Sequence, residues 1–261
     1  MDIPSLSKRL GPDPELDAIF AGVRELIGPE ALSDLIQDVL GAARIDQIVA
    51  QSASNAALIA RLERDADVLR EHRWVLSGIV VPVEAFQRAV DAYEDRRNLD
   101  AEQILAAAWT AELREAVVAL VTTVYLDEST RPIAQARRDL LAEASALHDE
   151  QRFAGAIPIL LAQADGIVGD LTGGTSTLFH RGQEVAVDDE TIAGHPNVLD
   201  AVRAELVKGC QATRIGGVFN RHATLHGRDV GYATEANAAR AWCLLTGVIE
   251  WAQPRARALP S

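Results

Sequence analysis

"RFAGAIPILLAQADGIV", Arg152 to Val168, carries the clearest periodic signal in the chain. Its apolar residues recur three and four positions apart, which is the spacing of one face of an α-helix. The members of this stripe are Phe153, Ala156, Ile157, Leu160, Leu161, Ala164 and Val168. Pro158 lies near the start of this stretch, and the regular spacing predicts a helix despite it. We therefore expect a helix that docks deep in a core and ends around the glycines of "GDLTGGTST".

Most of the remaining chain also predicts helix. Helical spacing is present over residues 16–27, 31–40, 55–69, 101–125 and 132–148, and again from Asn197 and from Thr234 onward. Thr234 is a good N-cap for the last helix, which should run to about residue 252. "WVLSGIVV", which Pro82 follows, fits a buried helix or a strand equally well. The stretch after the glycines, up to Asn197, predicts an irregular excursion that includes a small hairpin.

This pattern favours an all-α protein built as a helical bundle. We expect two parts: an N-terminal helical region over residues 1–150, whose role the sequence does not indicate, and a second helical domain over residues 151–255. A chain of 261 residues is long enough for each part to bury a core of its own.

Composition favours a soluble cytoplasmic protein. Apolar residues make up 48% of the chain and aromatic residues 5%. Cys210 and Cys243 are too few for a disulfide framework, and their neighbours favour simple packing. The start of the chain has no secretory signal pattern. Apolar runs such as "GIVVPV" and "AIPILLA" are far shorter than the roughly 20 residues that cross a bilayer, so no membrane contact is expected.

The charge of the chain is uneven. The net charge is −13, yet residues 201–261 carry eight Arg or Lys against four acids and are +4, which leaves −17 for the rest. A strongly acidic surface opposes nonspecific binding to nucleic acid, because phosphate contacts need cations. The basic C-terminal segment can still hold a local anion site.

That segment contains "NRHATLHGR", Asn220 to Arg228, which invites three interpretations. On a helix, His222 and His226 are four residues apart and share a face, which is metal-ligand spacing. In the zinc proteases that use HExxH, however, the residue after the first histidine is the glutamate that activates water, and here it is Ala223. No second Cys or His pair completes a structural zinc site. We therefore expect no metal and no other cofactor.

The second interpretation pairs Arg221 with His226. Five positions apart they lie about 140° around a helix axis, so only a cleft that wraps the helix end brings both to one phosphate. An imidazole can take a proton from a ribose 2′-hydroxyl or deliver one to a leaving 5′-oxygen. A guanidinium can fork onto the phosphoryl oxygens and stabilise their growing charge. Together these groups suffice for metal-independent cleavage of RNA.

"RHATLH" at the start of a late helix resembles the signature of the HEPN superfamily. The wider run "FNRHATLHGRDVGYATEANAARAWCLLTGVIE", with "AIPILLAQADGI" upstream, is similar to the C-terminal part of bacterial proteins with HEPN-like ends, over residues 150–252. The resemblance implies a helical-bundle domain, a homodimer with two motifs around one cleft, and in active members a ribonuclease that serves as toxin or antiviral effector. Arg221 and His226 would be the catalytic pair. His222 would fill the adjacent polar position, which is more often Asn, and its imidazole can also donate a hydrogen bond.

Neighbouring polar residues complete the predicted site. Asp165 lies at the border of the apolar helix, where a buried carboxylate needs a partner, and Arg221 or His226 is the candidate. An exposed aspartate at the helix end is the alternative for this residue, and the favoured one. Asn220 joins His222 and Asp165 as a supporting residue, and Arg228 and Tyr232 are candidate substrate-binding residues. Asp229 could line the same cleft or lie on loop surface. RNA is the expected substrate, and an antitoxin or a defence protein is a possible partner.

The third interpretation is structural. Asn220 could cap a short helix that ends at Gly227, with His226 and Arg228 as cations near its C-terminal end. Capping needs one or two polar groups and this stretch supplies five, which favours a ligand. A helical module without catalytic activity, which binds a protein or a nucleotide, is the alternative function, and the −17 remainder would then be its protein-facing surface.

Overall fold

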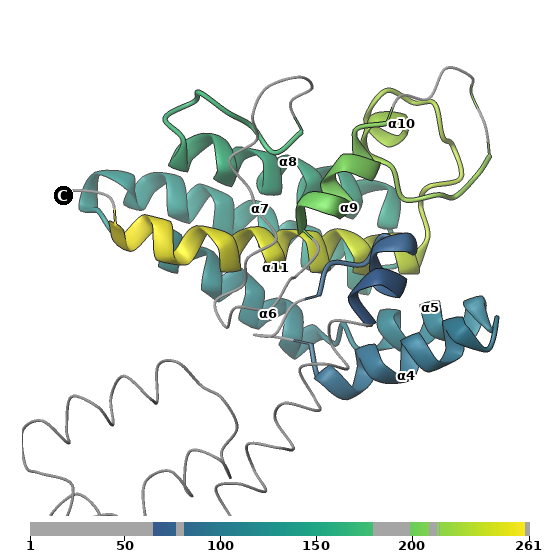
Figure 1. Ribbon diagram of the computed structural model, residues 1–261. Helices are drawn as coiled ribbons and strands as arrows, with labels where there is room; N and C mark the ends of the chain where they lie inside the picture. The colour runs from purple at the N-terminus through teal and green to yellow at the C-terminus, as the bar shows by residue number, and fades with distance from the viewer. Residues whose placement is uncertain (1–64, 77–80, 180–198, 209–212, 214, 259–261) are drawn as a thin grey trace, which may run out of the picture. The chain divides into compact units, whose positions relative to one another are not determined.

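The computed structural model describes residues 65–76, 81–179, 199–208, 213 and 215–258 (Figure 1). The chain divides into two compact units, residues 1–62 and 63–261, and all described residues belong to the second. Every regular element in the described ranges is a helix, so the predicted all-α class is confirmed. The helices expected over residues 16–27 and 31–40 and most of the excursion before Asn197 lie outside these ranges.

The helix predicted from "RFAGAIPILLAQADGIV" is α8, Phe153–Leu171. Apart from Phe153, which is half-buried, its apolar stripe is buried, and the helix packs most extensively against α11 and α7. The helix ends where Gly173 and Gly174 adopt positive φ angles of 59° and 76°. This left-handed turn lets the N–H of Gly174 donate to the carbonyl of Gly169 at 2.8 Å, which satisfies a carbonyl at the helix end.

α11, Glu235–Ala258, runs through the middle of the bundle in Figure 1 (yellow). It packs against α8, α5, α6 and α9. As predicted, Thr234 caps it: the Thr234 hydroxyl oxygen accepts from the N–H of Asn237 at 3.2 Å. Every residue from Asn237 to Gln253 is buried, although the sequence predicted an apolar stripe on one face only. The helix also continues past its predicted end near residue 252, through Pro254.

α7, Arg131–Asp149, confirms the helix predicted over residues 132–148, with proline in its first turn. A short turn, in which Gln151 has a φ of 57°, leads from α7 into α8. The boundary expected at residue 150 falls in this turn, between two helices that pack against each other within the 63–261 unit.

The single helix predicted over residues 101–125 is wrong. The structure instead has α5 (Asn98–Ala107), α6 (Ala111–Leu120) and the 3-10 turn η1 (Val121–Val124). Trp109 is buried at the break and stacks on Trp242 of α11, with ring centroids 5.9 Å apart. Thr110 then caps α6, its hydroxyl accepting from the N–H of Leu113. The helix therefore breaks at Trp109 and Thr110, although the apolar spacing of the sequence continues through them, because Trp109 packs on α11 and Thr110 caps a second helix.

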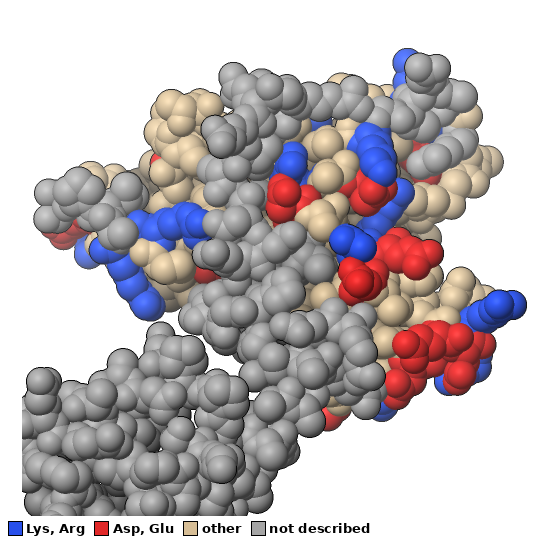
Figure 2. Space-filling model, viewed as in Figure 1, with Lys and Arg blue, Asp and Glu red and all other residues tan. Residues whose placement is uncertain are grey.

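The remaining described elements are shorter. They are α4 (Val83–Glu94), the 3-10 turn η2 (Glu128–Thr130), α9 (Leu199–Leu206) and α10 (Arg221–Leu225). α4 and α5 pack together as a hairpin at one end of the bundle (Figure 1), and Figure 2 shows acidic side chains gathered over it with basic ones at its tip. Within "WVLSGIVV", residues 74–76 are neither helix nor strand, and residues 77–80 lie outside the described ranges.

In the described part of the chain, α8 is the one helix long and apolar enough to span a membrane by length and composition alone. The expectation that no segment approaches this length is therefore wrong for α8, because the helix continues beyond "AIPILLA". A core helix of a soluble protein passes the same test, and α8 packs against α7 and α11. The finding is weak support for a membrane span.

Candidate functional site

Asn220 holds α10 in place. Its side-chain oxygen accepts from the N–H of Ala223 at 2.8 Å, and its side-chain nitrogen donates to the carbonyls of Glu205 (3.3 Å) and Lys208 (3.2 Å). The side-chain oxygen and both amide hydrogens are therefore used within the protein. The cap that the structural interpretation of the motif assigned to Asn220 is confirmed, and its amide has no hydrogen left to donate to a substrate.

Asp229 shapes the loop on the other side of α10. It is fully buried, and one carboxylate oxygen accepts from the N–H groups of Gly216 (3.2 Å), Gly217 (3.2 Å) and Gly231 (2.9 Å). Gly217 takes a φ of 63°, which brings its backbone close to that of Gly231. The sequence suggested that Asp229 lines a cleft or lies on the loop surface. Both expectations are wrong, because Asp229 is buried and holds the two ends of this loop together.

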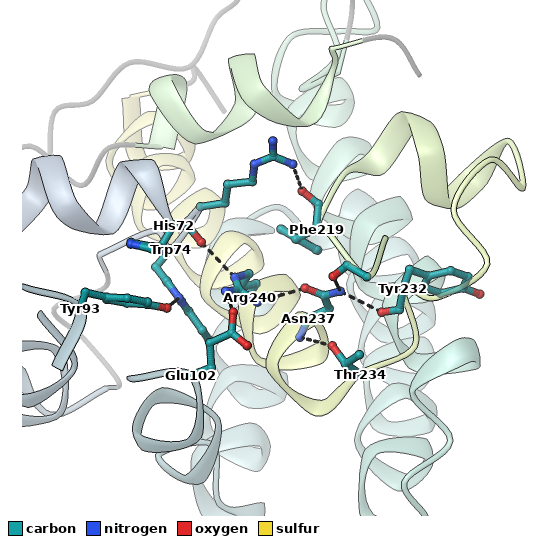
Figure 3. Close-up of polar contacts among 11 residues, drawn as sticks. His72, Trp74, Tyr93, Glu102, Phe219, Tyr232, Thr234, Asn237 and Arg240 are labelled. Atoms are coloured by element: carbon teal, nitrogen blue, oxygen red, sulfur yellow. Dashed lines mark hydrogen bonds and ion pairs between the residues drawn. The ribbon is translucent and has the colours of Figure 1, made fainter. Parts of the chain in front are cut away.

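Asn237 and Arg240, on the first turns of α11, tie this loop to the bundle (Figure 3). The Asn237 side chain donates to the carbonyls of Gly217 (2.7 Å) and Tyr232 (3.0 Å) and accepts from Arg240 (3.1 Å). The Arg240 guanidinium also donates to the His72 carbonyl (3.0 Å) and pairs with Glu102 of α5 (2.5 Å). The α10 loop is therefore fixed to α11, and α11 to α5, by buried polar contacts.

Aromatic rings complete this polar cluster. The Arg240 guanidinium lies 4.5 Å from the ring centroid of Trp74, whose indole N–H donates to the Tyr93 hydroxyl at 2.8 Å. His72 stacks on Tyr93 at 3.6 Å between centroids. Burial lowers the pKa of His72 and raises the pKa of Tyr93. Both shifts favour the uncharged forms of these rings beside the buried Arg240 guanidinium.

The histidine pair of the motif lies at the exposed end of α10. The rings of His222 and His226 are 4.5 Å apart between centroids and tilted by 52°, so the prediction that they share a face is confirmed. His226 is the C-cap residue and is exposed, whereas His222 is half-buried. His226 therefore presents an imidazole to solvent.

Arg221 lies on a different side of α10, over an open groove of about 630 Å³ beside α8. Its guanidinium carbon is 5.2 Å from the ring centroid of Phe179. Its Nε is buried and has no hydrogen-bond partner. The groove is also lined by Asp165, Asp170 and Leu225, and His226 is not among the lining residues. The structure therefore brings Arg221 together with the carboxylates of α8, and α10 separates it from His226.

The partner expected for Asp165 is wrong. Instead of an ion pair with Arg221 or His226, the Asp165 carboxylate accepts from the backbone N–H of Phe179 at 3.1 Å. The segment after α8 folds back over this helix, so that a backbone N–H, and not a cationic side chain, is the partner of Asp165. The groove consequently contains a guanidinium and a carboxylate that are not paired with each other.

Two further predicted residues lie at the margin of this region. The Tyr232 hydroxyl donates to the carbonyl of Ala154 at 2.9 Å, which joins the α10 loop to the first turn of α8. Arg228 is exposed. Neither residue lines the groove. No group of three or more His, Cys, Asp or Glu residues within the described ranges is arranged to hold a metal ion.

Comparison with known protein families, curated proteins and solved structures finds no match to this chain. The candidate site therefore rests on its own residues and geometry.

Sequence reasoning missed Phe179, Asn237 and Arg240. Asn237 and Arg240 are three residues apart on a helix otherwise dominated by Ala, Leu and Val, and that spacing was an available signal of a polar pair on one face. Phe179 carried no such signal, because only the fold of the chain after α8 places it between Asp165 and Arg221.

Proposed function

We propose that this chain is a metal-independent endoribonuclease in which Arg221 and His226 act on the scissile phosphate, as the resemblance of "RHATLH" to the HEPN signature implies. The observation that carries the proposal is that Arg221 lines a groove without an ion-pair partner among the described residues. Its guanidinium faces an open groove, its Nε has no hydrogen-bond partner, and no ion pair to it is formed within the described ranges. An unneutralised guanidinium at a groove is a ready site for a phosphate.

In the proposed reaction, the exposed imidazole of His226 takes the proton from the ribose 2′-hydroxyl. The 2′-oxygen attacks the phosphorus, the bond to the 5′-oxygen breaks, and the imidazolium returns the proton to that oxygen. The products are a 2′,3′-cyclic phosphate and a 5′-hydroxyl. Because α10 separates the two side chains within one chain, the proposal places Arg221 of the second copy in the homodimer at the same phosphate, where it stabilises the extra charge on the phosphoryl oxygens. His222, with its ring beside that of His226, supports the imidazole, and Arg228 offers a cation to the neighbouring phosphate.

The test is cleavage of a fluorescent single-stranded RNA in EDTA by the full chain and by three variants. His226→Ala and Arg221→Gln should each lower the rate by about a hundredfold or more, since general acid–base and electrostatic contributions are of that size. Arg138→Gln, which neutralises an exposed arginine on α7, should cleave like the parent. Cleavage that survives His226→Ala, or that requires a divalent metal, would contradict the proposal.

Association follows from the same resemblance. We propose that the chain acts in the cytoplasm as a toxin or defence effector, as a homodimer, with an antitoxin or other defence protein as its partner. Size-exclusion chromatography with light scattering tests the dimer directly, and a monomer at micromolar concentration would contradict it.

One observation favours the alternative, a helical module without catalytic activity that binds a protein or nucleotide. Asp165 and Asp170 line the groove beside Arg221, and carboxylates there oppose a polyanion. If neither the parent chain nor any variant cleaves RNA in the assay above, this module is the better description.

A further inference from the structure

We infer that the groove beside α8 is a binding site for a free α-amino acid with an apolar side chain, held by its carboxylate on Arg221 and by its ammonium group on Asp165. The inference starts from two opposite charges that line one groove of about 630 Å³ without pairing with each other.

Arg221 supplies the half of the site that recognises an anion. The ring of Phe179 supports its guanidinium at 5.2 Å, and the buried Nε has no hydrogen-bond partner. A guanidinium held at one side by an aromatic ring keeps its remaining N–H groups for a ligand, and their fork matches a carboxylate.

Asp165 supplies the half that recognises a cation. One of its oxygens accepts from the Phe179 backbone N–H at 3.1 Å, and the carboxylate makes no ion pair within the described ranges. A carboxylate with one neutral partner has lone pairs left for an ammonium group. Because both charged groups are fixed to the same residue, one by its ring and one by its backbone, they lie within reach of a single small molecule.

The other carboxylate at the groove is already neutralised. Asp170 accepts from two nitrogens of Arg137, at 3.0 and 2.7 Å, and from the Tyr125 hydroxyl at 2.6 Å. The uncompensated charges in the groove are therefore one positive and one negative, with a sum of zero. A zwitterion matches this pattern with both of its charges, whereas a phosphate would be matched by Arg221 alone.

The rest of the groove fits an apolar side chain. Leu161, Ala162 and Leu225 line it, and Leu225 keeps 40% of its surface exposed. Gly169 and Gly173 leave open space where a Cβ would point. Apolar walls with a few converging polar groups are the usual form of a small-molecule site.

Occupation of this site would also regulate the proposed ribonuclease, and this part of the inference rests on the proposed function. A ligand carboxylate on Arg221 takes the guanidinium that the RNA phosphate needs. The bound amino acid should therefore inhibit cleavage in competition with RNA.

The test is calorimetric titration of the full chain with L-leucine, which needs no cleavage assay. Two probes each lack one charge: L-leucinamide has no carboxylate, and 4-methylpentanoate has no ammonium group. Each should bind at least about tenfold more weakly than leucine, because a site built for a charged group rejects an analogue without it. Glycine, which keeps both charges, should also bind more weakly because it lacks the apolar side chain.

Matched variants separate the two charges. Asp165→Asn keeps an oxygen for the Phe179 N–H but loses the negative charge, and Arg221→Gln loses the positive charge. Both should abolish leucine binding while their thermal unfolding stays near that of the parent. Arg138→Gln, which neutralises an exposed arginine outside the groove, should bind leucine normally.

The possible outcomes are distinguishable. If leucine gives no heat, or if the amide and the deaminated acid bind as well as leucine, the inference is overturned whatever the chain does to RNA. If leucine binds through both charges and RNA is never cleaved, the amino-acid site stands and the proposed function fails. If leucine binds and cleavage continues unchanged at saturation, the regulatory part fails alone.

Discussion

Arg240 shows how one side chain can connect three parts of the bundle. It is 6% exposed, and its guanidinium reaches Asn237 on its own helix, Glu102 on α5 and the His72 carbonyl. A buried charge is costly unless such partners replace the lost water. Through Asn237, which donates to the carbonyls of Gly217 and Tyr232, this guanidinium also supports the α10 loop.

Replacing Arg240 should therefore destabilise the protein strongly. We expect Arg240→Met to lower the free energy of unfolding by roughly 3 kcal/mol, because it leaves Glu102 and two acceptors without their donor. Urea denaturation of the two proteins measures the difference. Arg138→Met, on the exposed side of α7, is the matched control and should change stability by less than about 0.5 kcal/mol. Equal losses in the two variants would refute a structural role for the Arg240 contacts.

His148 predicts a pH dependence of stability. Burial, with help from the positive charge of Arg114, lowers the pKa of His148 from 6.5 to about 4. The unfolded chain takes up this proton near pH 6.5 and the folded protein does not until about pH 4. Stability should therefore fall as the pH drops through this window, by up to about 1.4 kcal/mol per pH unit from this one group.

His148→Leu removes that group and tests the effect. Other carboxylates titrate in the same range, so the measured quantity is the difference between parent and variant in chemical denaturation at pH 7, 6, 5 and 4. The parent should lose more stability than the variant between pH 6.5 and 4. Parallel curves would show that His148 binds its proton equally well in both states.

At the scale of the element, α11 shows packing overriding propensity. Gly247 is in the middle of this helix, where alanine would ordinarily stabilise by up to about 1 kcal/mol. A Cβ there would lie 2.6 Å from a methyl carbon of Val75, which is buried and stiff. We expect Gly247→Ala to destabilise by about 1 to 3 kcal/mol.

Gly169→Ala in α8 is the matched substitution, because nothing lies within 4 Å of its added methyl group. It should leave stability unchanged or raise it slightly. Thermal unfolding of both variants provides the comparison. If Gly247→Ala has a melting temperature equal to or above that of the parent, the contact between α11 and Val75 can accommodate a methyl group and the prediction is wrong.

Elements with one apolar stripe were the ones the sequence predicted well. α7 and α8 begin and end within a few residues of expectation, because their periods are regular and proline or glycine marks their ends. The break between α5 and α6 was missed because its causes are tertiary. Trp109 leaves the helix to stack on Trp242, which is more than a hundred residues away in sequence.

In the candidate site too, features set by local spacing were predicted and features set by tertiary contacts were missed. The cap role of Asn220 and the shared face of His222 and His226 follow from local spacing, and both were predicted. The true partner of Asp165 was missed because it is a backbone N–H, which any residue type can supply. This main-chain contact places no requirement on the residue type at position 179, so the sequence carried no sign of it.

At the scale of the whole molecule, the described helices before and after residue 150 share one core. α11 packs against α5, α6 and η1, and α8 packs against α7. A protein of residues 63–261 should therefore unfold in one cooperative transition, whereas residues 151–261 alone would expose the apolar faces of α8 and α11 and should be unfolded or aggregated.

Circular dichroism during heating, together with light scattering, distinguishes these outcomes. A cooperative transition from residues 151–261 alone would establish the independent C-terminal domain that the sequence suggested, and would show that α4 to α7 are dispensable for its core.

All four tryptophans of the chain, Trp74, Trp109, Trp242 and Trp251, are buried in this unit, and residues 1–62 contain none. Indole fluorescence is therefore a selective optical reporter. Its red shift during denaturation will record the opening of the 63–261 unit alone, and any event seen by circular dichroism without a matching change in emission must come from elsewhere in the chain.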